Sequence, residues 1–232
     1  MLISITPAEA RAQNRVQRVE EASATDLIGR RGVEAPDPIS FLVECKPHYT
    51  IPPHFHDTPQ FQIFVRGGSR VGKHSSDAVS IHYVDAGTPY GPIVGDERGF
   101  AFLTMRQHSA VGYHEMPGSR HLMKDRPGRT RQEGPLARPA SDVAACRTLF
   151  EEPDGVAALE LCAPAGAALP QPSYRHGGAF ILVTGGSVET GGRRYDAAEN
   201  ACFWIDAGEA APDLKAGPDG AWALFLSFST DT

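Results

Sequence analysis

The chain repeats itself, and this repeat limits its fold more than any other feature of the sequence. Four short segments of the first half match four segments of the second half in the same order. The matched pairs are 43–47 with 160–164, 63–69 with 181–187, 81–87 with 202–208, and 100–103 with 222–225. The offset grows slowly from Cys45 and Cys162 to Phe100 and Trp222, as small loop insertions would cause. We therefore expect two copies of one domain.

The repeated segments are short apolar runs rich in residues that favour strands. Such runs lie at 39–45, 61–65, 79–84 and 100–104. The 24 glycines and 19 prolines provide turns between them, and Gly67-Gly68 is predicted to form a hairpin turn. One helix is expected, because Thr6-Pro7-Ala8-Glu9 matches a capping box and residues 10–21 can continue it. The predicted class is all-β with a short N-terminal helix.

Charge and composition argue against several classes of protein. With 22 Lys and Arg against 28 Asp and Glu, the net charge of −6 provides no basic field, so we expect no nucleic-acid partner. No apolar run is long enough to span a membrane, and the N-terminal residues lack the order of a signal peptide. The four cysteines form no CxxC pair. We expect a cytoplasmic protein with reduced cysteines and no membrane association.

The two copies are separated by a basic segment without strand periodicity. The predicted domains are residues 1–106, with the helix and the first copy, and residues 146–232, with the second copy. Residues 107–145 are interpreted as a solvated linker, or alternatively as an arm that binds substrate.

The strongest sign of chemistry is Pro52-Pro53-His54-Phe55-His56-Asp57-Thr58-Pro59-Gln60. On a strand, His54 and His56 point to the same face, and Gln60 follows after a short bend. Two neutral imidazoles and an oxygen suit a divalent first-row metal with open coordination positions. The alternative is that the two histidines are ordinary surface residues.

These residues resemble a known family. His54-x-His56-x3-Gln60-x6-Gly67 is similar to the first signature motif of the cupin superfamily, with glutamine where glutamate is most common. Gly87-Thr88-Pro89-Tyr90 resembles the second motif, which usually ends in histidine. Together with the repeat, the chain resembles a bicupin over residues 39–106 and 158–228. The resemblance implies two tandem jelly-roll β-barrels and a metal inside the first one, held by the residues at the motif positions.

Two departures from the motifs change the expected site. Tyr90 stands where a histidine ligand is usual, so we expect His82 as the leading fourth ligand, with Tyr90 or another residue as alternatives and His74 as a weaker one. Tyr90 is then a candidate proton donor or orienting hydrogen-bond partner. Gln60 lacks the charge of a carboxylate, which favours anionic, oxygen-bearing substrates. Gln62 points to the same face as Gln60 and is a candidate for hydrogen bonds to substrate or ligand.

The second copy is expected to hold no metal. Its residues opposite His54, His56 and Gln60 are Pro172, Tyr174 and Gly178. Its apolar residues are expected to pack a core that serves structure or dimerisation.

The function predicted from these features is that of a metal-dependent cupin enzyme acting on a small oxygenated organic anion. Its reaction is expected to be that of a dioxygenase or of a lyase or isomerase, because cupins include all of these. We expect one divalent metal per chain (iron, manganese, zinc or nickel) and a homodimer. The alternatives are a non-catalytic small-molecule-binding or regulatory bicupin, and a structural protein with a vestigial site.

Overall fold

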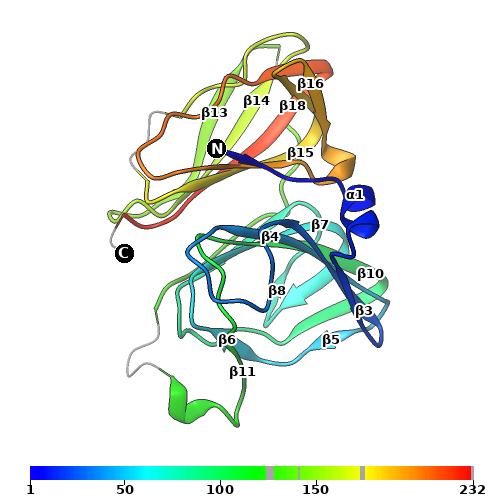
Figure 1. Ribbon diagram of the computed structural model, residues 1–232, viewed down its shortest axis with the longest axis vertical. Coiled ribbons are helices and arrows are strands. Elements are labelled where there is room, and N and C mark those ends of the chain that lie inside the picture. The colour runs from blue at the N-terminus through cyan, green and yellow to red at the C-terminus, as the bar shows by residue number, and fades with distance from the viewer. Residues whose placement is uncertain (124–127, 141, 173–175, 231–232) are drawn as a thin grey trace. The chain divides into compact units, whose positions relative to one another are not determined.

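The computed structural model describes residues 1–123, 128–140, 142–172 and 176–230, and most of its regular structure is strand (Figure 1). The predicted all-β class is therefore confirmed. The chain divides into two compact units, residues 8–137 and residues 138–232 together with residues 1–7. Within the described residues, no helix is long and apolar enough to cross a membrane.

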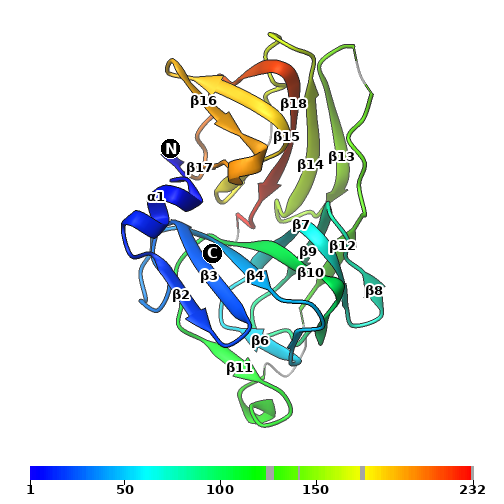
Figure 2. The same cartoon turned by 90° about the vertical axis from the view of Figure 1, so that its right-hand side faces the viewer.

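The first unit is built on a sheet with the order β12-β9-β7-β10-β4-β3-β2, in which β5 also pairs with β10 and β8 with β7. β6 and β11 form a separate pair. The strands are β2 (Val16–Val19), β3 (Ala22–Ile28), β4 (Ile39–Cys45), β5 (Thr50–Ile51), β6 (His54–His56), β7 (Gln60–Val71), β8 (His74–Ser75), β9 (Ser80–Val84), β10 (Ile93–Arg106), β11 (Tyr113–Glu115) and β12 (Thr130–Glu133). In Figure 2, β2, β3 and β4 lie on one side of this unit and β7, β9 and β12 on the other, so the sheet curls around an interior.

The second unit has the strand order β1-β17-β15-β18-β14-β13, with β16 beside β15. Its strands are β1 (Leu2–Ile3), β13 (Ala145–Glu151), β14 (Ala157–Ala163), β15 (Ala179–Thr190), β16 (Arg193–Asp196), β17 (Cys202–Ile205) and β18 (Lys215–Ser227). A short 3-10 helix, η2 (Ala197–Glu199), precedes β17. The first residues of the chain thus complete the sheet formed by its last third.

The internal repeat of the sequence corresponds to equivalent strands. Its matched segments lie on or overlap β4 and β14, β7 and β15, β9 and β17, and β10 and β18. These strands follow the same order in both sheets, β9-β7-β10-β4 and β17-β15-β18-β14. An order shared over four strands that also match in sequence supports two copies of one domain.

The predicted hairpin at Gly67-Gly68 is wrong. β7 continues through both glycines to Val71, and the chain turns at Gly72. Gly67 has a φ of +76°, and a Cβ atom there would lie 1.9 Å from the carbonyl oxygen of Gly99 on β10. Glycine is therefore needed where two strands approach closely beside a register shift, not where the chain reverses.

The N-terminal helix is shorter than the sequence pattern indicates. α1 spans only Pro7–Ala12, and Val16–Val19 forms β2 instead. Asn14 adopts a φ of +53°, a left-handed conformation that commonly ends a helix.

The segment interpreted as a linker belongs largely to the first unit. β11 pairs with β6, and β12 pairs with β9, so residues up to 137 pack with the first copy. A 3-10 helix, η1 (Arg120–Leu122), lies between these strands. Residues 1–7, expected with the first copy, belong to the second unit through β1. The strands β1, β11 and β12 are short, and their apolar and polar residues do not alternate clearly. They are therefore defined by the strands with which they pair and not by a pattern in their own sequence.

Asp85 fixes the end of this segment to β9. Its carboxylate accepts hydrogen bonds from the Arg129 backbone N–H (2.8 Å) and Nε (2.9 Å), and from the Tyr83 hydroxyl (2.7 Å). Burial alone would raise the pKa of Asp85, but the hydrogen bonds from Arg129 outweigh it and hold that pKa below its usual value. At neutral pH the Asp85 carboxylate is therefore ionised, and it accepts hydrogen bonds from both Arg129 and Tyr83.

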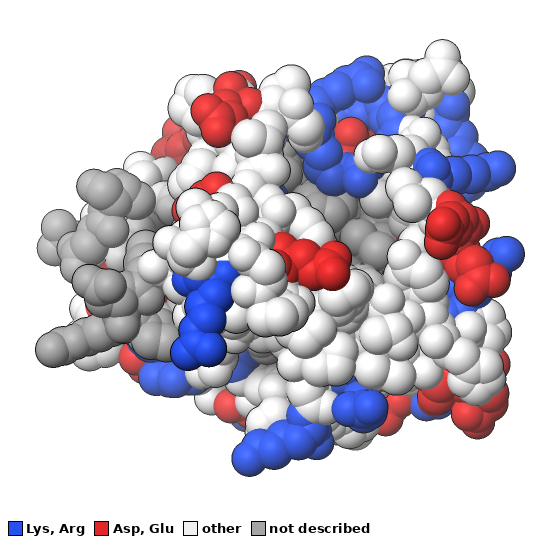
Figure 3. Space-filling view, turned by 90° about the horizontal axis from the view of Figure 1, so that it is seen from below, with Lys and Arg blue, Asp and Glu red and all other residues white. Residues whose placement is uncertain are grey.

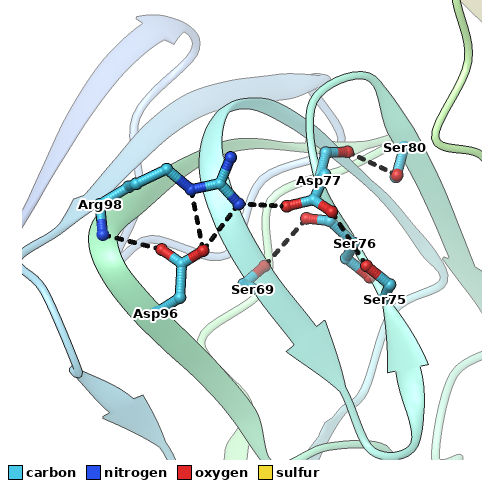
Figure 4. Close-up of polar contacts among 7 residues, drawn as sticks. All are labelled: Ser69, Ser75, Ser76, Asp77, Ser80, Asp96 and Arg98. Atoms are coloured by element: carbon cyan, nitrogen blue, oxygen red, sulfur yellow. Dashed lines mark hydrogen bonds and ion pairs between the residues drawn. The ribbon is translucent and has the colours of Figure 1, made fainter.

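A second ionic network lies on the surface (Figure 4). Arg98 bonds Asp96 (2.6 Å) and Asp77 (2.7 Å), which connects β10 to the chain after β8. The Arg98 side chain is 56% exposed, so solvent screens this network strongly.

Asp85→Asn is expected to destabilise the first unit by about 2 kcal/mol, because charge-assisted hydrogen bonds are lost in a half-buried place. Urea unfolding followed by far-UV circular dichroism measures this cost. Asp77→Asn, in the screened network, serves as the matched control and should cost under about 0.5 kcal/mol. Equal costs for the two variants would contradict the docking of residues 128–133.

Candidate active site

The structure brings the residues singled out by the sequence to one place in the first unit. These residues are His54, His56, Gln60, Gln62, His82 and Tyr90. β7 and β9 pair so that Gln62 lies opposite His82. Two backbone hydrogen bonds join His54 to Tyr90, from His54 N to Tyr90 O (3.1 Å) and from Tyr90 N to His54 O (3.0 Å). All six are in the first unit, and His74 is exposed on β8 instead.

Four side chains form one hydrogen-bonded chain. Arg106 Nε donates to Gln60 Oε1 (2.9 Å), and Gln60 Nε2 donates to the Tyr90 hydroxyl (2.6 Å). The Tyr90 hydroxyl lies 2.7 Å from His54 Nε2. Because guanidinium is only a donor, the atom of Gln60 that faces Arg106 must be its oxygen. The hydrogens therefore run in one direction, and the Tyr90 hydroxyl donates to His54.

Three histidines have the same tautomer. The Nδ1 atoms of His54 and His56 lie 2.7 Å from the carbonyl oxygens of Pro52 and Gly112, and carbonyls only accept. His82 Nδ1 lies 3.0 Å from Gln62 Oε1. Each Nδ1 therefore carries the hydrogen, and each Nε2 has a lone pair.

Burial keeps these histidines neutral. It lowers the pKa of His54 to about 4, and the Arg106 charge lowers it further against the hydrogen bond to Pro52. Burial, with Arg106 second, lowers the pKa of His56 to about 2. Burial likewise lowers the pKa of His82 to about 3. Burial raises the pKa of the Tyr90 hydroxyl well above its usual value, against the charge of Arg106. At neutral pH the proton between Tyr90 and His54 therefore resides on Tyr90.

Arg106 is a buried cation without a carboxylate partner. It is 5% exposed, and no ion pair joins it to Asp or Glu within the described residues. Its guanidinium lies 5.7 Å from the Phe41 ring centre. Burial lowers the pKa of Arg106 to about 10, so it remains charged at neutral pH. Arg31 also lies over Phe41 (5.0 Å), but it pairs with Asp26.

β11 covers the two histidines of β6. Tyr113 lies opposite His56 in the register of the pair and stacks on His54, with ring centres 4.7 Å apart. His114 Nε2 lies 2.9 Å from Asp57 Oδ1, which holds β11 in place. The segment assigned as a linker thus provides one wall of the site.

A cavity of about 690 Å³ opens beside these groups. His54, His56, Gln62 and Arg106 line it. The cavity is not lined by Gln60, Tyr90 or His82. Tyr90 instead contacts the lining residue His54, Gln60 contacts Tyr90, and His82 contacts the lining residue Gln62. Tyr90 therefore acts on the cavity through His54.

Arg106 and Tyr113 are the residues that the sequence argument missed. Arg106 follows Phe102 and Thr104 at intervals of two on β10, so all three point to one face. This alternation was a usable signal, because Phe102 belongs to a predicted strand. Tyr113 gave no such signal, because β11 has only three residues and is defined by its pairing with β6.

The side chains fit a divalent metal only in part. His54 and His56 have metal-ligand character, because their Nδ1 hydrogens are bound and their rings lie 5.1 Å apart. The oxygen of Gln60, its only ligand atom, faces Arg106 instead. In the described part of the chain, no three or more His, Cys, Asp or Glu residues are grouped as a metal site. The two imidazoles are the donors that fit, and the Tyr90 hydroxyl competes with a metal for His54 Nε2.

Comparison with solved structures defines the fold. Oxalate decarboxylase from Lactobacillus farciminis, in a formate complex, matches with a TM-score of 0.67 at 11% identity, covering 99% of this chain and 87% of that one. This chain has the cupin fold. A mutant of Bacillus subtilis oxalate decarboxylase matches with a TM-score of 0.66 at 11% identity, over 98% of this chain and 77% of that chain. A "putative dioxygenase" from Nostoc punctiforme matches with a TM-score of 0.60 at 12% identity, over 94% and 78%.

The cupin fold that the motifs indicate is therefore confirmed. The solved structures of Bacillus subtilis oxalate decarboxylase include one concerned with its Mn(II) centres, matched with a TM-score of 0.63 at 12% identity over 100% of this chain and 78% of that one. No protein-family model matches the chain, and no curated protein sequence matches it. At these identities the likeness concerns the fold, and the chemistry must be argued from the site.

The second unit has a filled interior. Among the residues aligned with the histidine motif, Gly178 has a φ of +119° and packs against Trp204, where a Cβ atom would lie 2.3 Å from the ring. Tyr174 lies outside the described residues. A core cluster that includes Ile181, Phe203 and Phe225 occupies the interior.

Proposed function

We propose that the first unit is a cupin enzyme that converts a small oxygenated organic anion beside a divalent metal. On this proposal the two units are tandem cupin barrels, and the second barrel is structural. The main support is the chain from Arg106 through Gln60 and Tyr90 to His54, which ends at a cavity lined by neutral imidazoles and one unpaired cation. Dioxygenase and lyase or isomerase reactions are both compatible with such a site.

Arg106 and Gln62 are proposed to bind the anion. A guanidinium offers paired donors to a carboxylate, and Arg106 stays protonated because the pKa of about 10 lies above neutral pH. Gln62 lines the same cavity, and its amide is oriented by His82. The substrate is thus held at one fixed place.

His54 and His56 are proposed to hold the metal at their Nε2 atoms, and at His54 the metal would replace the hydrogen bond that the Tyr90 hydroxyl donates to Nε2. When bound, the metal supplies Lewis acidity that polarises a substrate oxygen. The Pro52 and Gly112 carbonyls orient the two rings. In the metal-free site Tyr90 keeps its proton and donates it in a hydrogen bond to His54 Nε2, which orients that ring, so we propose Tyr90 as a positioning residue.

Metal and anion binding are proposed to favour each other. The positive charge of Arg106 contributes to the low pKa of His54 and His56. An anion at Arg106 offsets this charge and so favours a cation at the two Nε2 atoms. The metal is therefore expected to bind more tightly when the anion is present.

His56→Ala is expected to weaken Mn²⁺ binding by at least about 100-fold, because a direct ligand is lost, whereas Gln60→Ala should weaken it by about tenfold. Calorimetric titration with Mn²⁺ and the Mn(II) spin-resonance signal measure this difference. His74→Ala, which removes an exposed histidine, is the control and should bind as the wild type does. Unchanged Mn²⁺ binding by His56→Ala would contradict the proposed ligand.

A non-catalytic anion-binding protein is the second candidate. The observation in its favour is that Arg106 can bind an anion without any metal. Oxygen uptake and product analysis of the metal-loaded protein with a panel of small organic acids separate the two. Turnover that disappears in His56→Ala supports the enzyme, and tight binding without turnover supports the binding protein.

A further inference from the structure

The walls of the first-unit cavity change in character along β10. Arg106, Thr104 and Phe102 line it from one face of this strand. At 3.2–3.4 Å per residue, Arg106 and Phe102 are roughly 13 Å apart along the strand. β4 continues the pattern, because its Phe41 and Val43 lie opposite Thr104 and Phe102. The cavity thus has a charged end and an apolar end.

The apolar end is built from several strands. Phe102 and Val43 are joined there by Ile51 of β5 and Ala22 of β3. These side chains belong to or pack against one hydrophobic cluster, so the wall is a continuous apolar surface. A two-carbon acid bound at Arg106 would leave this wall in contact with water.

The charged end of the cavity favours a ligand that carries a negative charge. Among the described residues that line the cavity, none is Asp or Glu. Arg31 pairs with Asp26, whereas no ion pair joins Arg106 to Asp or Glu within the described residues. Figure 3, which shows the molecule from below, has Lys and Arg interspersed with Asp and Glu over that face. Within the cavity, the charge that selects an anion is therefore the buried guanidinium of Arg106.

We infer that the cavity binds an amphipathic monocarboxylate, with the carboxylate at Arg106 and an apolar chain or ring against Phe41, Val43 and Phe102. The inference names the substrate class of the proposed function and rests on the same site. A volume of about 690 Å³ suits it, because cavities of 300–1,000 Å³ bury ligands of many heavy atoms. The apolar wall contributes about 0.8 kcal/mol per buried CH₂, which corresponds to about fourfold in affinity.

The test is calorimetric titration of the chelator-treated protein of 232 residues with acetate, butyrate, hexanoate and hexanamide. Hexanoate is expected to bind at least tenfold more tightly than acetate, which lacks an apolar body, and than hexanamide, which lacks the charge. Equal affinities across the acid series, or equal affinities of hexanoate and hexanamide, overturn the inference without any variant.

Arg106→Met is expected to lower hexanoate affinity at least tenfold and to leave hexanamide affinity within about threefold. Arg66→Met is the control, because Arg66 is an exposed arginine paired with Glu44 and lies outside the cavity. Unchanged hexanoate binding in a folded Arg106→Met protein overturns the inference.

The outcome is separable from that of the proposed function, because this binding needs neither metal nor turnover. Hexanoate binding in a protein without metal affinity or turnover supports the inference and refutes the metal-dependent enzyme. Metal-dependent turnover limited to two-carbon acids supports the enzyme and overturns the inference.

Discussion

Lowering the pH from 7.5 to 5 is expected to destabilise the metal-free first unit by about 4 kcal/mol through His54 and His82 alone, about 2 kcal/mol for each. Both side chains are 3% exposed. Burial lowers the pKa of His54 to about 4 and that of His82 to about 3. In the unfolded chain both return to their usual pKa of about 6.5. Between these values the unfolded state binds more protons than the folded state, so stability falls as the pH falls.

Urea unfolding at pH 7.5, 6 and 5 measures this effect, with far-UV circular dichroism as the signal. His82→Asn keeps an N–H that can donate to Gln62 and removes one titrating group. The pH dependence of its unfolding free energy should be smaller by about 2 kcal/mol over the same range, whatever the absolute stability of the variant. A wild-type protein equally stable at pH 7.5 and 5 would show that these histidines are not buried as neutral groups.

Phe225→Ala is expected to destabilise the second unit by about 3–5 kcal/mol, because a large cavity replaces a fully buried ring. Phe225 is 1% exposed. Its strand neighbours in register are Leu159 and Ile181, and its ring contacts His176 edge to face at 5.7 Å. These neighbours come from separate strands, so they cannot easily close the space left behind.

The two tryptophans of the chain, Trp204 and Trp222, both lie on strands of the second unit. Their fluorescence in a urea titration therefore reports the unfolding of that unit. Val143→Ala, at a position that is 68% exposed, is the control and should cost under about 0.5 kcal/mol. A cost below about 1 kcal/mol for Phe225→Ala would mean that the interior of the second unit is loosely packed or open to a ligand.

The sequence alone predicted the strands and their repetition, because short apolar runs and matched segments can be read from the sequence without knowing any tertiary contact. The repeat placed 63–69 and 181–187 on equivalent strands, β7 and β15, and both strands are central in their sheets. The sequence pattern gave a wrong or missing prediction where the conformation of a segment depends on a strand that is distant in the sequence. Gly67 and Gly68 lie within β7 and not in a turn, and Gly67 lies where β7 and β10 approach closely. β11 and β12 are defined by their pairing with β6 and β9.

In the candidate site, too, some features could be predicted from the sequence and others only from the tertiary structure. Its histidine motif and Gln62 are visible as spacings within a few residues, which the geometry of one strand is enough to interpret. The direction of the Gln60 amide, the placement of Tyr90 behind His54 and the uncompensated charge of Arg106 were decided only by tertiary structure. Each depends on which donor meets which acceptor once water is excluded, and a sequence does not state such pairings between residues far apart in the chain.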